Sequence, residues 1–235
     1  AAGDDSASWK DAGIRVTLSK VTSMSYGPTG FVRTITATEV VQVTDRLPQV
    51  PGASIAYVGD LANNKFVSLI DISLNSGDPC GSASVASATA DSTHSGYVRA
   101  HATSKTVTIP QQVLLDASKT FTLCYAEGDG TSNDATWRDS YVRVKITKIE
   151  SLFSHSISHK TTGTIANNAA LQLTYSGSLA NNKWVFLADQ TLYGGDPCAG
   201  PVTALGYFDN VAAGDVSRTG VLQAGASDKI LTLDT

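Results

Sequence analysis

Apolar and polar residues alternate in two stretches near the middle of the chain. Residues 121–125 (FTLCY) and residues 141–148 (YVRVKITK) both show this alternation, and a polar loop over residues 126–139, rich in Gly, Asp, Ser and Asn, separates them. Successive side chains of a β-strand point to opposite faces of a sheet, so the pattern predicts a β-hairpin, the last of a β-sandwich.

Similar patterns predict strands along most of the chain, and helical periodicity is poor throughout. Two further stretches alternate, two are nearly continuous apolar runs typical of a central buried strand, and two are weaker. In that order they are residues 54–58 and 171–175, residues 66–70 and 184–188, and residues 97–100 and 105–109. About seven short strands in each half predict an all-β protein of two immunoglobulin-like β-sandwich domains.

The sequence repeats itself. Residues 59–67 (GDLANNKFV) return as residues 177–185 (GSLANNKWV), and the Gly-Asp-Pro-Cys turn ending at Cys80 returns 118 residues later, ending at Cys198. The tripeptide Trp-Lys-Asp at residues 9–11 returns as Trp-Arg-Asp with a spacing of 128. Repetition at a fixed spacing indicates a duplicated structural unit.

The two units are out of phase with the ends of the sequence. Residues 22–149 contain every strand expected of a sandwich, with residues 141–148 as the last. Residues 150–235 form a second unit without a counterpart of residues 121–148. Residues 1–21 hold a spare copy of the final strand, so we predict that they form an N-terminal donor strand.

A sandwich without its last strands leaves unpaired backbone groups and an open core, which something must cover. Either the chain continues beyond Thr235 as a longer tandem array, or another copy inserts its N-terminal strand by strand donation. In the second case donor and acceptor lie at opposite ends of one chain, so the contact generates an open filament. The donor residues, with the aliphatic ones facing the acceptor core, are Ile14, Arg15, Val16, Thr17 and Leu18.

The three cysteines fit the same interpretation. Cys80 and Cys124 fall in the complete unit, and a disulfide between them would close a loop of about 45 residues and stabilise it by roughly 4 kcal/mol. Such a bond indicates an oxidising compartment. Cys198 corresponds to Cys80, but the position matching Cys124 falls beyond the sequence, so we predict that Cys198 is unpaired within this chain.

Composition excludes several classes of function. Charged residues make up 16% of the chain and the net charge is −4, so no basic surface exists to attract nucleic acid. No apolar run is long enough to span a membrane. The sequence contains no nucleophile elbow, zinc-protease helix, phosphate loop or carboxylate pair. We therefore predict no enzyme activity and no cofactor.

Two clusters of polar residues have alternative interpretations. The loop before the last strand carries oxygen ligands suited to calcium, but its spacing is not that of an EF-hand and exposed turns use the same residues. We predict no metal, with calcium as the weaker alternative at Asp129, Asn133 and Asp134. The chain has no Asn-x-Ser/Thr acceptor for N-linked sugar. A small-residue segment could carry O-linked sugars or be an ordinary loop. Its hydroxyl residues are Ser82, Ser84, Ser87, Thr89, Ser92, Thr93 and Ser95.

The closing hairpin and the layout of the repeat resemble known architectures. Residues 123–126 (LCYA), the polar loop and residues 141–148 resemble the closing F and G strands of immunoglobulin-like domains, although Cys80 follows the central strand instead of lying on the B strand. Two copies with a spare N-terminal strand resemble extracellular head-to-tail filament proteins, often coated with glycans, and tandem arrays on algal or protist surfaces, including flagellar hairs. The resemblance implies an extracellular or cell-surface structural subunit whose partners are its own copies. The alternative is an adhesin or a pair of carbohydrate-binding modules.

Overall fold

The computed structural model describes residues 10–26, 33–36, 46–154, 157–158, 165, 170–189, 191–195, 197–198 and 213–233. Within these residues the chain is almost entirely β-structure with one short α-helix, which confirms the predicted all-β class. In the part of the chain so described, no helix has both the length and the apolar character needed to cross a membrane.

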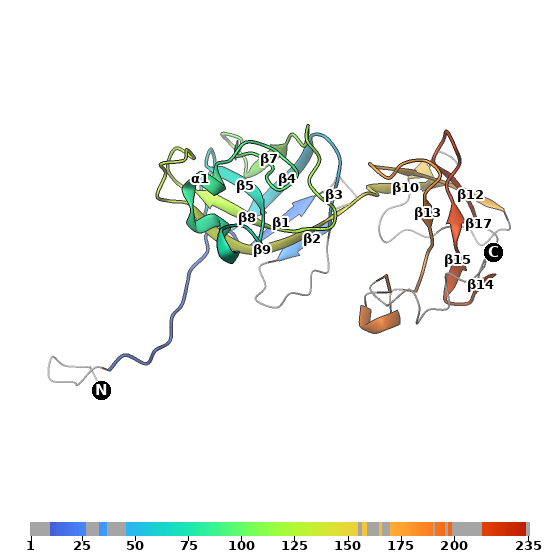
Figure 1. The fold of residues 1–235 in the computed structure, drawn as a ribbon, viewed down its shortest axis with the longest axis horizontal. Helices are drawn as coiled ribbons and strands as arrows, with labels where there is room; N and C mark the ends of the chain where they lie inside the picture. Colours follow the sequence, from blue (N-terminus) through green and yellow to red (C-terminus); the bar gives the residue numbers. More distant parts are fainter. Residues whose placement is uncertain are drawn as a thin grey trace.

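We call residues 20–148 the first half and residues 149–233 the second half. The strands of the first half are β1 (Ser23–Tyr26), β2 (Arg33–Thr36), β3 (Arg46–Pro48), β4 (Ala53–Val58), β5 (Phe66–Asp71), β6 (Val98–Arg99), β7 (Thr106–Ile109), β8 (Thr120–Ala126) and β9 (Arg138–Thr147). They form a four-stranded sheet in the order β2-β1-β4-β7 and a five-stranded sheet in the order β3-β9-β8-β5-β6. Residues of both sheets share one buried cluster, so the sheets pack face to face over a common core (Figure 1).

The predicted closing hairpin is present. Strand β8 lies between β5 and β9 and is antiparallel to both, and every residue from Phe121 to Ala126 is buried. Strand β9 begins at Arg138, three residues before the predicted start. The short strand β3 pairs with its end in parallel.

A third layer covers the outer face of the five-stranded sheet. After β5 the chain forms two short 3₁₀ turns, η1 (Asn75–Gly77) and η2 (Pro79–Gly81), and the helix α1 (Ala83–Ala86). Their buried side chains form a second apolar cluster with residues of β5 and β8. The predicted Cys80–Cys124 disulfide joins this layer to β8, with the Cα atoms 5.4 Å apart. It therefore fastens a covering segment to a sheet instead of joining two sheets.

Trp137 belongs to the same outer cluster. It is buried, and its indole Nε1 donates to the Thr131 carbonyl at 3.2 Å. A buried indole with its polar group satisfied anchors the loop before β9 against the sheet. Its sequence counterpart, Trp9, lies outside the described residues.

The second half repeats the first sheet strand for strand. Its elements are β10 (Ser151–Ser154), β11 (Ile157–Ser158), β12 (Leu171–Ser176), β13 (Trp184–Val185), η3 (Leu192–Gly195), β14 (Ala213–Asp215), β15 (Arg218–Gly220), β16 (Leu222–Gln223) and β17 (Ile230–Leu233). The order β11-β10-β12-β17 matches β2-β1-β4-β7, whereas the remaining strands form only two-stranded sheets, β13-β16 and β14-β15.

Candidate functional site

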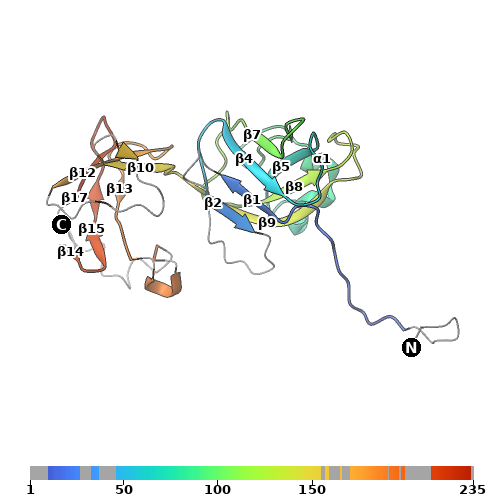
Figure 2. The same cartoon turned by 180° about the vertical axis from the view of Figure 1, so that it is seen from behind.

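An extended N-terminal segment leaves the body of the first half (Figure 1, Figure 2). Residues 10–19 contain no strand, and both views place this segment and the second half at opposite ends of the molecule. The side chains of Ile14, Val16 and Leu18 are 74%, 77% and 85% exposed. The predicted donor residues thus form an exposed apolar stripe. By contrast, Val21, inside the predicted N-terminal unit, is buried in the core of the first half.

The same pattern is buried where it recurs 128 residues later. Val142, Val144 and Ile146 of β9 correspond to Ile14, Val16 and Leu18, and they are 0%, 0% and 2% exposed. Alternate residues of β9 face the core, and those between them are only half-buried. A segment of this pattern is therefore stable as the covered closing strand of a sheet.

The segment also shares the backbone conformation of β9. Gly13 and Tyr141 both have positive φ angles, 72° and 61°. The Asp11 carboxylate accepts a hydrogen bond from the Gly13 amide at 2.8 Å, and Asp139 accepts one from the Tyr141 amide at 2.7 Å. The N-terminal segment therefore has the same local bend that β9 has at Tyr141, where its pairing with β8 shifts register.

An ion pair is repeated as well. Arg15 contacts Asp11 with an N–O distance of 2.7 Å, and Arg143 contacts Asp139 at the same distance. The hydrogen bond from Arg15, and then that from the Gly13 amide, lowers the pKa of Asp11 to about 2. An exposed pair contributes little to stability, but its geometry repeats the arrangement seen in β9.

The same backbone hydrogen bond links the N-terminal segment to the first half and β9 to the second half. The Leu61 amide donates to the Lys20 carbonyl at 3.0 Å, and the Leu179 amide donates to the Lys148 carbonyl at 3.0 Å. Thus Lys20 makes the same backbone contact at the start of the first half that Lys148 makes at the start of the second. The N-terminal segment therefore precedes the first half in the same way that β9 precedes the second half.

The open edge lies in the second half, at β13. The pairs Trp184–Gln223 and Val185–Leu222 repeat the register of β5 with β6, and the bridge from Ala188 to Arg218 repeats that of Ile70 with His94. The opposite edge of β5 makes six residue pairs with β8. Within the described residues no strand takes the corresponding place beside β13.

This difference opens the core of the second half. Val67 and Leu69 of β5 are fully buried, but their counterparts Val185 and Leu187 are only half-buried. Trp184 is 61% exposed. The strand predicted over residues 184–188 shortens to Trp184–Val185, because β13 pairs along one edge only.

The cysteines also differ between the two halves. Cys80 and Cys124 are bonded and buried, whereas Cys198 is free and exposed.

The predicted hydroxyl cluster divides by exposure. Ser84, Thr89 and Ser92 are exposed, and Ser82, Ser87 and Thr93 are half-buried. Ser95 is buried, and its hydroxyl accepts from the Leu69 amide and donates to the Gly96 carbonyl. Ser95 therefore presents no accessible hydroxyl for a sugar.

In the loop considered above as a calcium site, the carboxylates accept hydrogen bonds from residues of the same loop. Asp129 accepts from Thr131, while Asp134 is buried and accepts from Gly130 and Thr136. The Asn133 side chain forms no hydrogen bond with the described part of the chain. In the described part of the chain no three acidic, histidine or cysteine side chains are grouped to hold a metal. These contacts give the loop residues a structural role.

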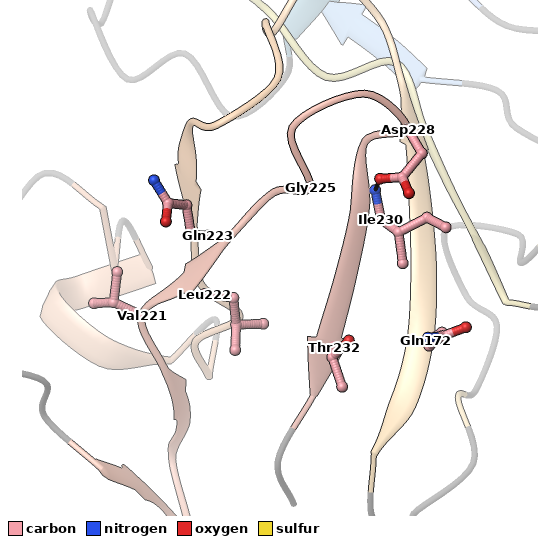
Figure 3. Close-up of a pocket in the computed structure, with 8 residues that line it drawn as sticks. All are labelled: Gln172, Val221, Leu222, Gln223, Gly225, Asp228, Ile230 and Thr232. Carbon is pink, nitrogen blue, oxygen red and sulfur yellow. Dashed lines mark hydrogen bonds between the residues drawn. The ribbon is translucent and has the colours of Figure 1, made fainter.

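The second half also contains an open cavity of about 470 Å³. Figure 3 shows its lining, drawn from β12, Val221 just before β16, β16, β17 and the turn between the last two strands, with Asp228 at one end. The Asp228 carboxylate accepts from the Ile230 amide at 3.1 Å. None of the eight lining residues is aromatic, so the cavity offers no ring on which a sugar could stack.

Sequence patterns missed several residues of the site. Asp11, Lys20 and Trp184 were not singled out, although the spacing Asp-x-x-x-Arg recurs 128 residues apart and could have identified Asp11. Trp184 carries no such signal, because its role depends on which strand is absent beside it. Comparison of the chain with protein-family models, curated protein sequences and solved structures found no match.

Proposed function

We propose that this chain is a structural subunit of an extracellular filament, in which copies assemble head to tail by donating a β-strand. Each subunit would contain two immunoglobulin-like β-sandwich domains, the second completed by the N-terminal segment of a neighbour. In the first half the chain crosses several times between the two facing sheets, and this topology supports the fold. The shared sheet order of the second half supports the same assignment.

One observation carries the proposal: residues 11–18 repeat the backbone bend and the ion pair of a buried strand and are exposed. Burying three aliphatic side chains contributes about 5 kcal/mol before the entropy of association is subtracted. The segment already has the backbone bend and the ion pair of β9, so it loses less conformational freedom on docking. Because donor and acceptor lie at opposite ends, each added copy leaves another free donor and acceptor.

Other features support the extracellular and structural parts of the proposal. A disulfide is compatible with an oxidising environment. The exposed hydroxyls of Ser84, Thr89 and Ser92 are the members of the cluster best placed for O-linked glycans. The partners proposed are therefore further copies of the chain, with glycans on its surface, and no catalytic role is assigned.

A pair of matched substitutions tests strand donation. Val16→Asp places a charge on the stripe proposed to enter the acceptor, whereas Thr17→Asp places the same charge on the opposite face. We expect electron microscopy to show filaments for the parent chain and T17D, and only short particles for V16D. Equal assembly of V16D and T17D, or absence of filaments from the parent chain, would overturn the proposal.

A further inference from the structure

Among its described residues, the second half has no counterpart of two strands, β8 and β9. In the first half β8 lies between β5 and β9, so the closing strand β9 does not touch β5. The N-terminal segment corresponds to β9 in sequence, backbone bend and ion pair. If it docks as β9 does, the place directly beside β13 is still vacant among the described strands.

We propose that the edge of β13 binds a second strand, a counterpart of β8 that carries a cysteine, and that Cys198 forms a disulfide with that cysteine. This inference rests on the proposed function, because it concerns the same acceptor: the donated segment docks at the place of β9, and the second strand adds to it at the place of β8. The partner is defined by its chemistry: an apolar β-strand with cysteine, then tyrosine, then an acidic residue two positions further on.

The position of the cysteine follows from the repeat. In the first half Cys124 lies opposite Ser68 in the pairing of β8 with β5, and it bonds to Cys80 from the Gly-Asp-Pro-Cys turn. The same turn precedes Cys198. Trp184 and Val185 of β13 pair with β16 in the register in which Phe66 and Val67 of β5 pair with β6. If the turn before Cys198 packs over β13 as the turn before Cys80 packs over β5, a strand seated as β8 is seated brings its cysteine to Cys198.

The tyrosine and the acidic residue follow from the junction lysines. The Lys20 amide donates to the Tyr125 hydroxyl at 3.1 Å, and the Lys20 ammonium contacts the Glu127 carboxylate at 2.5 Å. Lys148 is the counterpart of Lys20 and is exposed. An incoming strand with the same two residues would place a hydroxyl and a negative charge at Lys148.

Trp184 marks the surface that the strand and its loop would cover. Its counterpart Phe66 is half-buried, and Gly130 of the β8–β9 loop lies so close that an added Cβ would be 2.4 Å from the Phe66 ring. Trp184 has no such cover and is 61% exposed. Docking of a hairpin of this type therefore buries a tryptophan, which is directly observable.

The bond requires an oxidant, which we take to be a small-molecule disulfide of an oxidising compartment. The Cys198 thiolate attacks this disulfide, forming a mixed disulfide and releasing one thiol. The partner cysteine then attacks the Cys198 sulfur and releases the second thiol. Two cysteine thiols and one disulfide thus become one protein disulfide and two small thiols.

The test appends a copy of residues 118–148 to the full chain after Thr235, through a flexible Gly/Ser linker. Two matched controls carry the same extension, one with the appended copy of Cys124 as serine and one with the appended copy of Leu123 as aspartate. All are incubated with glutathione disulfide. Cys198 is then assayed by alkylation and peptide mapping, and Trp184 by emission wavelength and acrylamide quenching, each taken as the difference from the same chain carrying Trp184→Phe.

We expect Cys198 to become unreactive and bonded to the appended cysteine, with Trp184 emission shifted to shorter wavelength and its quenching reduced. The serine control should retain the Trp184 change and lose the bond, and the aspartate control should lose both. A reactive Cys198 together with an exposed Trp184 in the unmodified extension overturns the inference. So does docking of the N-terminal segment directly on β13, seen as cross-linking of residue 16 to residue 185. The cross-link would leave the proposed filament formation unaffected. If the extended chain forms the Cys198 bond but the parent chain forms no filaments, only the proposed function is overturned.

Discussion

The backbone amide of Lys20 donates a hydrogen bond to the hydroxyl of Tyr125 at 3.1 Å, which ties the start of the first half to the strand at its centre. Tyr125 is buried, and it follows the disulfide-bonded Cys124. The entry of the chain is thus fixed by a strand that lies about a hundred residues later. This contact makes the position of the N-terminal segment dependent on the closing hairpin.

Tyr125→Phe should destabilise the first half by about 1–2 kcal/mol, because the Lys20 amide loses its acceptor while the ring is retained. Urea unfolding followed by circular dichroism measures the change. Tyr141→Phe is the matched control, since the Arg143 guanidinium lies over the Tyr141 ring and the Tyr141 hydroxyl forms no hydrogen bond with a described residue. Equal effects of the two substitutions would show that the Lys20 contact contributes nothing.

Gly59→Ala should destabilise the first half by about 3 kcal/mol or more. An added Cβ would lie 2.2 Å from the Lys20 carbonyl oxygen, and the backbone at Gly59 has a φ of 128°. Gly52→Ala is the control, because Gly52 also has a positive φ but nothing lies within 4 Å of the added atom. It should lose only about 1–2 kcal/mol. Thermal unfolding separates the two, and similar losses would rule out the steric contact.

Strands whose pattern is local could be predicted from the sequence. The alternation in β4, β8 and β12 and the apolar run in β5 place these strands to within a few residues, because burial of one or two faces determines which residue types occur. The repeat also predicts which strands lack a counterpart in the second half. These features need no knowledge of distant partners.

Features that depend on distant contacts could not be predicted in this way. Strand β3 is three residues long and exists because it pairs with β9, nearly a hundred residues later. Strand β13 is shorter than its pattern suggests, because among the described strands only β16 pairs with it. At the candidate site, the apolar stripe could be predicted, but the width of the opening depends on β8 lying between β5 and β9.

Acid should weaken the first half through Asp91. Burial raises the pKa of its carboxyl, but hydrogen bonds from the Thr93 amide and hydroxyl and from His94 outweigh burial and lower the pKa to about 2. A depressed pKa means that this contribution is present above the unfolded-state pKa of about 4 and is lost as the pH falls to about 2. Because the side chain is 55% exposed, the contribution is about 1 kcal/mol after screening.

Asp91→Asn tests that assignment. The variant should be less stable than the parent near neutral pH, and the difference should vanish as the pH approaches 2. Denaturant unfolding at several pH values gives the two curves. A difference that stays constant across this range would show that the charge on Asp91 is not responsible.

Reduction of the Cys80–Cys124 disulfide should release the outer layer before the core. The bond spans 44 residues and fastens η2 to β8, so its loss should lower the free energy of unfolding by about 4 kcal/mol on the chain-entropy model. Limited proteolysis should then cut first within residues 82–97, because the apolar cluster over the sheet loses its covalent attachment. Cys80→Ala should reproduce both effects, and Cys198→Ser should produce neither, since Cys198 is free and exposed. Proteolysis that instead begins in β8 or β9 would mean that the bond supports the core directly and that the outer layer stays in place without it.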